Sequence, residues 1–487
     1  MVNRKTVAVI GGGVSGLAAA RAFDEQGHRV LGYERTHDIG GVWEPSRSYP
    51  GVRTQSPKDF YRYTDMAMPD DYPEWPSGQQ VHAYLHRFAD KHDLHRLFSL
   101  NTGVRSVDRR VDGAPGWRLT LESAGRSVVQ EVDFVAVCTG QFSDKNIITH
   151  PGQDAFLAQG GQVIHSSEYI DPTTVQGKRL VVLGGSKSAT DIAVNAVENG
   201  AKQVTMVYRH NVWRIPYHIG GINFKWLLYP RFQEVQFNGW GRSPLQKAVA
   251  AIAKPFVWAN LKGLETMISV QEGLKKHNMK PAVPIDAEVG CTIPLMTEGL
   301  MKYVRAGKIK PVIGTYDRYE GDEIVLSNGE RVGCDLSVLA VGWKLGFPFL
   351  NQDSLDKLID RDGLYKLYRF CVNPDLPDLG FVGIASSFAT VLNADMMAKW
   401  LVRFADGQLA RQPSDAEMRD NIEMMLNWKR HERPAAQPYG GLCTAPFHLK
   451  YFEELLEDIG AKKCRPVYPR AEVYHQSLRA APDYRAG

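Results

Sequence analysis

The stretch Val7-Ala-Val-Ile-Gly11-Gly-Gly13-Val-Ser-Gly16 decides the fold of the first part of this chain. Its four apolar residues predict a buried strand, its glycines a tight turn, and the Ala-rich segment 15–24 a helix. The following strand, 29–33, ends beside Glu34. Gly11 permits the turn, Gly13 lets backbone N–H groups approach a pyrophosphate, and Gly16 allows close packing of helix on strand. A carboxylate at the position of Glu34 accepts hydrogen bonds from a ribose diol, so this β-α-β unit is predicted to bind a dinucleotide without a 2′-phosphate.

A second glycine motif follows at Leu180-Val-Val-Leu-Gly184-Gly-Ser186-Lys-Ser-Ala189, with a helix expected near 188–199 and a strand over 204–209. Ser186 and Ala189 replace two glycines of the pattern, and both are small enough to leave room for a phosphate. This strand ends in Arg209, and a guanidinium can pair with a 2′-phosphate through two hydrogen bonds. The contrast between Glu34 and Arg209 predicts FAD at the first motif and NADPH at the second, and hence a flavin-dependent redox enzyme.

The residues expected to bind NADPH are those of the second motif and of the helix that it opens, together with the arginine after the next strand. Lys187 could place a charge beside the phosphate. The equal alternative is that Lys187 is an ordinary surface lysine surrounded by solvent. The full set is Gly184, Ser186, Lys187, Ser188, Ala189, Thr190, Asp191 and Arg209.

Length and composition favour a folded enzyme with more than one domain. A chain of 487 residues is too long for one ordinary core. It is 44% hydrophobic and 23% charged, as folded proteins are. Its net charge of +4 is small and spread without runs, which argues against a nucleic-acid partner and leaves a small-molecule substrate.

Cysteines and apolar segments exclude other classes of site. The six cysteines lie far apart, with neither a C-x-x-C pair nor metal-ligand spacing, so we expect no metal site and no redox-active disulfide. The first residues carry no signal-peptide core, from which we expect a cytoplasmic enzyme. The most apolar helical segment, 245–264, contains three lysines and Pro255, so no transmembrane segment is expected.

The order of these units predicts an α/β protein with two Rossmann-like dinucleotide-binding domains, the NADPH domain being inserted in the FAD domain. Buried strands are also expected over 117–121, 130–137 and 336–341, the last two ending near glycines. The expected bounds are 1–170 and 335–450 for the FAD domain, 171–334 for the NADPH domain, and 451–487 for a C-terminal tail. Within the NADPH domain, the aromatic and helical insertion at about 210–282 is expected either to cover the active site or to form an oligomer contact, so a homodimer stays open.

Four further motifs in the same order make the chain similar to the flavin-containing monooxygenases, within the class B flavoprotein monooxygenases that include Baeyer–Villiger enzymes. They are Gly40-Gly41-Val42-Trp43, Tyr49-Pro-Gly51-Val-Arg53, Gly161-x-x-x-His165-x-x-x-Tyr169 and Asn393-Ala-Asp395-Met-Met-Ala-Lys399-Trp400. The resemblance covers most of the chain. Gln159 stands where the third motif normally opens with phenylalanine. The resemblance implies that Gly41, Val42, Trp43 and Thr54 also contact FAD, and that His165 is a strut in a hinge between the domains rather than an acid or base.

The resemblance also singles out Gln55 as the candidate catalytic residue. Relatives that oxidise heteroatoms usually carry an asparagine near the flavin here, and Baeyer–Villiger enzymes an aspartate. The amide of Gln55 keeps the donor and acceptor of asparagine and could hydrogen-bond the flavin or its peroxide; the alternative is that it caps a local turn. The stretch 290–294 lacks the arginine that Baeyer–Villiger relatives carry in a similar stretch, which favours oxidation of nitrogen or sulfur.

The activity that the resemblance implies is an NADPH- and O2-dependent monooxygenation. NADPH would reduce FAD, O2 would form a C4a-(hydro)peroxyflavin, and one oxygen atom would pass to a small organic substrate. Baeyer–Villiger oxygenation of a ketone is the first alternative. A flavoprotein reductase that passes electrons to a partner is the second, but the cysteines offer no disulfide or iron–sulfur cluster for it. Several aromatic residues could line an apolar substrate cavity, although each singly is expected to be ordinary core or interface. They are Trp213, Tyr217, Phe224, Trp226, Tyr229, Phe232, Phe237 and Trp240.

Overall fold

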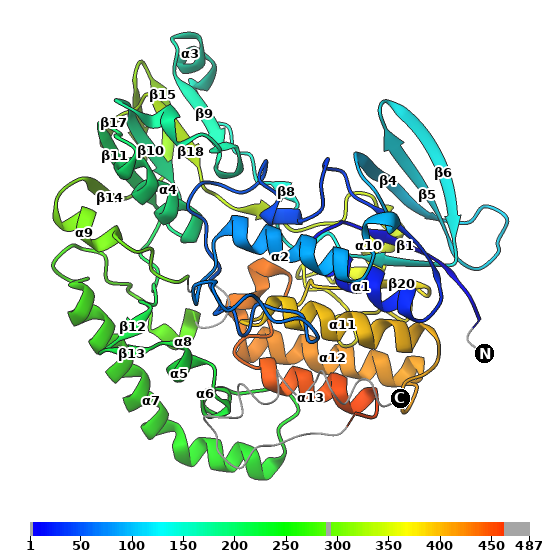
Figure 1. Cartoon of the computed structure of the whole chain (residues 1–487). Helices are drawn as coiled ribbons and strands as arrows, with labels where there is room; N and C mark the ends of the chain where they lie inside the picture. Colours follow the sequence, from blue (N-terminus) through cyan, green and yellow to red (C-terminus); the bar gives the residue numbers. More distant parts are fainter. Residues whose placement is uncertain (1–2, 289–293, 462–487) are drawn as a thin grey trace.

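A computed structural model describes residues 3–288 and 294–461 of the chain (Figure 1). The first glycine motif joins strand β1 (Thr6–Ile10) to helix α1 (Val14–Glu25), and strand β2 (Arg29–Tyr33) follows. They belong to a parallel five-stranded sheet of order β20-β7-β1-β2-β3. The other strands are β3 (Phe98–Ser99), β7 (Phe134–Val137) and β20 (Leu379–Phe381). All residues of β7 and β20 are buried, as in a parallel sheet covered on both faces.

The second glycine motif builds a sheet of the same kind. It joins β10 (Arg179–Leu183) to α4 (Lys187–Glu198), followed by β11 (Gln203–Tyr208). The parallel sheet has the order β14-β11-β10-β18-β9. Its other strands are β9 (Gln162–His165), β14 (Ile309–Ile313) and β18 (Leu336–Leu339). Two parallel sheets, each opened by a glycine motif, confirm the predicted α/β class with two Rossmann-like units.

The strand pairing corrects the expected edges of the second unit. Residue 170 was expected to end the first part of the FAD domain and residue 335 to begin its second part. However, β9 precedes 170 and β18 follows 334, and both lie in the second sheet, where Leu336 pairs with Leu180 and with Gln162. The expected edges therefore cut through this sheet. The edges of the second unit lie further apart than expected. Backbone hydrogen bonds between distant segments decide which strands belong to this sheet, and the sequence does not show these bonds.

The expected strand over 130–137 is two strands in different sheets. Strand β6 (Arg126–Val132) belongs to an antiparallel sheet of order β4-β5-β6, whereas β7 belongs to the first parallel sheet. Asp133 separates them, and its Oδ2 accepts a hydrogen bond from the Thr6 N–H at 2.6 Å. This bond ties the turn between β6 and β7 to the first residue of β1. The partners of β6 are β4 (Thr102–Arg109) and β5 (Trp117–Ser123).

Smaller elements complete the second unit and the connection between the units. An antiparallel sheet is formed by β15 (Tyr316–Glu320), β16 (Glu323–Leu326) and β17 (Arg331–Gly333). Strand β8 (Asp144–Lys145) pairs with β19 (Trp343–Lys344) where the chain passes between the two large sheets. The short helices are α3 (Gln153–Ala158) and α9 (Leu300–Arg305).

The segment 210–282 extends away from both large sheets. Figure 1 shows its main element, α7 (Pro244–Glu272), as a long arc at the edge of the molecule. Only Leu261, Glu265, Ile268 and Ser269 of this helix are buried. None of the described helices is long and apolar enough to cross a membrane. The other elements in and near this segment are β12 (His218–Ile219), β13 (Ile222–Asn223), α5 (Lys225–Leu228), α6 (Arg231–Gln236) and α8 (Ile285–Glu288).

The C-terminal helices pack beneath the first sheet, with α11 (Thr390–Ala405) beside α1 (Figure 1). A buried charged cluster joins them: the Asp395 carboxylate accepts the Thr64 N–H at 2.9 Å and lies 3.2 Å from Lys399 Nζ and 3.6 Å from Arg21 Nη1. Burial opposes ionisation of Asp395, but the two cations outweigh it and hold its pKa below the usual value. The remaining helices are α10 (Gln352–Leu358), α12 (Asp415–Glu432) and α13 (His448–Asp458). Residues 462–487 of the expected tail lie outside the described residues.

Candidate active site

The first glycine turn leaves no space for side chains. A Cβ atom on Gly16 would lie 1.8 Å from the carbonyl oxygen of Gly11, and one on Gly11, whose φ is +105°, would lie 2.8 Å from that of Cys138. Gly13 is the N-cap residue of α1, and no side chain caps this helix end. The first backbone N–H groups of α1 are therefore open toward an anion, as a pyrophosphate-binding turn requires.

Glu34 occupies the end of β2 with its carboxylate turned to the glycine turn. The residue is 4% exposed. Its Oε2 accepts the Gly12 N–H at 2.6 Å, and its Oε1 accepts the Thr36 N–H at 2.9 Å. These bonds fix the carboxylate beside the turn, where the sequence motif predicted an acceptor for a ribose diol.

The loop at 40–43 lies directly on this turn. The Gly40 N–H donates to the Gly12 carbonyl oxygen at 3.0 Å, and a Cβ on Gly41 would lie 3.0 Å from the Cα of Gly13. In the 3-10 turn η1 (Gly41–Trp43), the Trp43 indole N–H donates to the Tyr61 hydroxyl at 2.8 Å. The structure thus brings Gly41, which Val42 and Trp43 follow, to the first motif, and their contact with FAD stays a prediction.

Three buried polar atoms in this part of the chain have no hydrogen-bond partner. Within residues 3–288 and 294–461, the hydroxyl groups of Thr54 and Thr139 and the Oδ1 of Asn393 have no hydrogen-bond partner. Thr139 follows β7, next to Gly11, and Asn393 lies in the first turn of α11. Leaving such atoms unpaired costs about 1–3 kcal/mol each, so they fit a site that a polar cofactor completes. Asn393 and Thr139 are absent from the set predicted by sequence. Asn393 opens one of the four family motifs, but only the fold brings it near this turn, and Thr139 had no signal in the sequence.

The second glycine turn repeats the geometry of the first. Gly184 has a φ of +146°, and a Cβ there would lie 2.3 Å from the Ala340 carbonyl oxygen. Ser186 is the N-cap residue of α4, and its side chain makes no capping bond. The N–H groups that open α4 are thus free of side-chain acceptors, and the residues present at both turns fit a bound dinucleotide.

Two arginines lie near the second turn, of which the motif identified one. Arg209, directly after β11, is exposed and forms no ion pair or hydrogen bond with any residue of the described ranges. Arg214 is 3% exposed, and its Nη2 donates to the Gly185 carbonyl oxygen at 2.6 Å. Burial lowers the pKa of Arg214, which places an incompletely solvated cation against the turn. In the sequence, the only sign of the role of Arg214 is the presence of an arginine in the loop after β11.

Asp191 on α4 joins the second turn to the segment that follows the first. Its Oδ2 accepts the Tyr49 hydroxyl at 3.0 Å, and its Oδ1 accepts Lys187 Nζ and the Thr297 hydroxyl, each at 2.5 Å. The Thr190 hydroxyl lies 2.7 Å from that of Thr297. Burial, with the Asp191 charge adding to it, raises the pKa of Tyr49 well above its usual value. Lys187 is therefore neither the solvated lysine of the alternative reading nor free to turn to a phosphate without leaving Asp191.

Gln55 forms a second contact between these parts of the chain. Its Oε1 accepts the Leu295 N–H at 3.0 Å, and its residue surface is exposed. The bond reaches a distant segment, so the expected alternative, a cap on the local turn, is wrong for this oxygen. The preceding stretch compared with the Baeyer–Villiger arginine, Gly290-Cys291-Thr292-Ile293, lies outside the described residues.

His165 acts as a hydrogen-bonding strut. At the end of β9, its Nε2 lies 3.0 Å from the Gly342 carbonyl oxygen, and its Nδ1 accepts the Ser167 N–H at 3.2 Å. These partners require a neutral ring with the proton on Nε2. Burial lowers the pKa of His165, in agreement with the neutral form. The ring ties β9 to the turn after β18.

Half of the eight aromatic residues considered for a substrate cavity are buried in the core. Tyr229, for example, packs on Phe60 at 4.6 Å and on Phe388 at 5.2 Å between ring centroids. Trp226 is 42% exposed. The side chain of Phe232 lies outside the described part of the chain. Those that are buried are Trp213, Phe224, Tyr229 and Trp240.

The chain matches the model of the family described as flavin-binding monooxygenase-like over residues 4–467. It belongs to this family. The chain is therefore a flavin-dependent monooxygenase, as predicted, and its two glycine turns belong to an oxidoreductase.

Individual relatives agree with this membership. The monooxygenase is 29% identical to the dimethylaniline monooxygenase [N-oxide-forming] 2 of Pan troglodytes, over 94% of this chain and 83% of that protein. Among solved structures, S-allyl-L-cysteine S-oxygenase from Allium sativum is similar with a TM-score of 0.64 and 19% identity, covering 100% of this chain and 96% of that one. Cyclohexanone monooxygenase from Rhodococcus sp. Phi1, bound to NADP+, has a TM-score of 0.65 and 17% identity, covering 100% and 99%.

Proposed function

We propose that this monooxygenase uses FAD, NADPH and O2 to transfer one oxygen atom to nitrogen or sulfur of a small organic substrate. The observation that carries the proposal is the pair of uncapped glycine turns in one chain, one beside a fixed carboxylate and the other beside arginine. The flavin supplies the oxygen chemistry when bound, and the protein positions the groups and excludes water.

The residues proposed to hold FAD surround the first turn. The backbone N–H groups of Gly13 and of the start of α1 would receive the pyrophosphate, and Glu34 the ribose hydroxyls. Gly11, whose N–H donates to the Tyr33 carbonyl oxygen at 2.8 Å, would shape the turn, and Gly16 would let α1 pack close to it. The turn at Gly41–Trp43 and the unpaired hydroxyl of Thr54 would supply further contacts.

The residues proposed to hold NADPH surround the second turn. The N–H groups from Ser186 to Ala189 would receive the pyrophosphate, and Arg209 the 2′-phosphate. Arg214 adds a second positive charge behind the turn. Lys187 and Asp191 would act on the cofactor through their shared network with Tyr49 rather than by a free charge.

Gln55 is proposed to contact the reacting part of the flavin. Its Oε1 is held by Leu295, so its Nε2, for which none of the described residues provides a hydrogen-bond partner, is the atom left to donate to a flavin or oxygen atom. A neutral amide can donate there without bringing a charge into a site that excludes water.

The choice of nitrogen or sulfur over a carbonyl carbon is supported by the names of relatives. One relative is an N-oxide-forming enzyme and one structural neighbour an S-oxygenase. Cyclohexanone monooxygenase, whose name points to a ketone substrate, supports the alternative of Baeyer–Villiger oxygenation.

A substrate panel decides between them. Tertiary amines, thioethers and cyclic ketones of matched size would each be given to the holoenzyme with NADPH under 18O2. The proposal expects substrate-dependent NADPH use and one 18O atom in an N-oxide or sulfoxide. Labelled esters or lactones as the main products would establish the alternative, and NADPH use without labelled product from any class would refute both.

The oligomeric state and location are separate proposals. We propose a homodimer in which α7 pairs with its copy, because its exposed apolar residues recur at the heptad spacing of a coiled-coil seam. These residues are Leu245, Val249, Ile252 and Phe256, each at least 57% exposed. Light scattering should give twice the chain mass for the wild type and the single mass for Ile252→Glu. A cytoplasmic location is also proposed, and cell fractionation tests it.

A further inference from the structure

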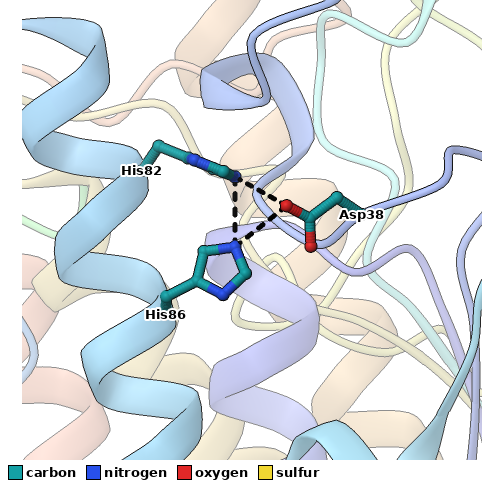
Figure 2. Close-up of side chains that lie close together, drawn as sticks. All are labelled: Asp38, His82 and His86. Atoms are coloured by element: carbon teal, nitrogen blue, oxygen red, sulfur yellow. Dashed lines mark hydrogen bonds and ion pairs between the residues drawn. The ribbon is translucent and has the colours of Figure 1, made fainter.

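Three side chains near the first turn, but separate from the proposed cofactor contacts, converge on one point (Figure 2). Asp38 lies in the loop after β2, and His82 and His86 lie on α2 (Gly78–Lys91), where their spacing of four residues places both rings on one face. Asp38 Oδ2 is 3.3 Å from His82 Nε2 and 3.0 Å from His86 Nε2. The two Nε2 atoms are 3.3 Å apart.

This triangle has the dimensions of one face of a metal coordination tetrahedron. With bonds of about 2.0–2.1 Å to zinc, the ligand atoms of a tetrahedral site lie about 3.3–3.4 Å from one another. Two imidazole nitrogens that face each other at 3.3 Å cannot both carry a proton between them. A cation in place of that proton satisfies all three atoms at once.

The surroundings orient these atoms in advance. The second oxygen of Asp38, Oδ1, accepts the Ile39 N–H at 2.8 Å, which turns Oδ2 toward the imidazoles. The Ile39 carbonyl oxygen lies 3.0 Å from His82 Nε2 and, like a water molecule, could supply a fourth ligand. The side chains of the three residues are 15–32% exposed, so an ion can reach them from solvent. Two imidazoles and a carboxylate are typical zinc ligands.

We infer that Asp38, His82 and His86 form a binding site for a divalent transition-metal ion, of which Zn2+ best fits the ligands. The sequence prediction of no metal site considered only cysteine spacing and missed the pair of histidines on α2. Their spacing was visible, but the carboxylate that completes the set comes from a loop that only the fold brings to α2.

A metal here would act on the first glycine turn. A Cβ on Gly40 would lie 2.6 Å from Cδ2 of His82, so α2 and this loop are in tight contact. The same Gly40 donates its N–H to the Gly12 carbonyl oxygen. Binding of the ion would hold α2, the loop and the turn as one unit and thereby slow the loss of a bound dinucleotide. This consequence rests on the proposed FAD site, whereas the metal site itself does not.

Calorimetric titration with ZnCl2 tests the site. The holoenzyme, freed of any affinity tag and treated with a chelator, should bind one Zn2+ per chain. His82→Gln and His86→Gln should each weaken binding at least about tenfold, since even residues behind the ligands cost 10–100-fold. His37→Gln is the matched control, because His37 neighbours Asp38 in sequence but its side chain is 67% exposed and lies outside the triangle.

X-ray absorption and flavin release complete the test. The zinc edge should show nitrogen and oxygen ligands only. Far-UV circular dichroism of the two variants should match the wild type, which excludes misfolding. Equal binding by wild type and variants, or sulfur among the ligands, overturns the site. If Zn2+ binds as expected, it should slow the fluorescence increase on FAD release in the wild type but not in His86→Gln, and an unchanged rate overturns the link to the glycine turn.

Discussion

Replacement of Arg209 by alanine should lower kcat/KM for NADPH but leave kcat/KM for NADH nearly unchanged. Arg209 is exposed at the end of β11 and pairs with no other described residue, so its loss should change the free energy of unfolding by no more than about 0.5 kcal/mol. A hydrogen bond to a charged group contributes about 1.5–3 kcal/mol, and only NADPH carries the 2′-phosphate that accepts it. At about 1.4 kcal/mol per factor of ten, kcat/KM for NADPH should fall roughly 12- to 150-fold.

Steady-state flavin reduction by each nucleotide measures this effect. For NADH, kcat/KM should stay within about twofold of the wild type, because a solvated arginine contributes nothing to its binding. His210→Ala, a change at the adjacent exposed position, is the control for disturbance of the loop. An equal fall for both nucleotides would show that Arg209 contacts a phosphate common to them. If kcat/KM fell for neither nucleotide, the 2′-phosphate would be bound by another cation, and Arg214 would be the first residue to test.

Gly13→Asp should yield protein with little flavin colour. A Cβ at this position would lie 3.3 Å from the Gly41 Cα, and the added carboxylate would repel the pyrophosphate. A full flavin spectrum in the purified variant would disprove this role of Gly13. Gln55→Leu should leave the FAD content unchanged but release more hydrogen peroxide and less product per NADPH. Gln55→Asn, which keeps the amide, should stay closer to the wild type. If NADPH use in the leucine variant stays as tightly coupled to product formation as in the wild type, Gln55 takes no part in the reaction. Burial lowers the pKa of His448 from 6.5 to about 4, so the unfolded chain binds the extra proton between these values. The contribution of His448 to the free energy of unfolding should therefore be fully present above pH 6.5 and be lost as the pH drops toward 4, by at most about 1.4 kcal/mol per pH unit. Urea titrations should show that the free energy of unfolding of His448→Gln falls less steeply over this range.

Part of the site could be predicted from sequence because its geometry is local. The turns at Gly11–Gly16 and Gly184–Ala189 are set by strand, glycine and helix residues adjacent in the chain, and the acidic or basic residue follows one strand later. The exact helix ends agree within a residue or two, as for α1 and α4. Such features need no knowledge of long-range contacts.

The contacts between distant segments could not be predicted in this way. Tyr49 reaches Asp191, and Gln55 reaches the Leu295 N–H, only after both sheets have formed and faced each other. Arg214 lies in a loop whose return to the turn at Gly185 has no sequence signature.

The sequence by itself therefore determined the α/β class, the two nucleotide motifs with their opposite charges, and the monooxygenase family, because each is written in residues whose spacing fixes local backbone geometry. The tertiary structure alone decided that β9 and β18 belong to the second sheet, that Lys187 is bound to Asp191, and that a loop carboxylate meets two histidines of α2. The physical reason is the same in each case. Hydrogen bonds and charge contacts between remote segments depend on where the packed core places them, and side-chain type along the chain does not encode that placement in any short window.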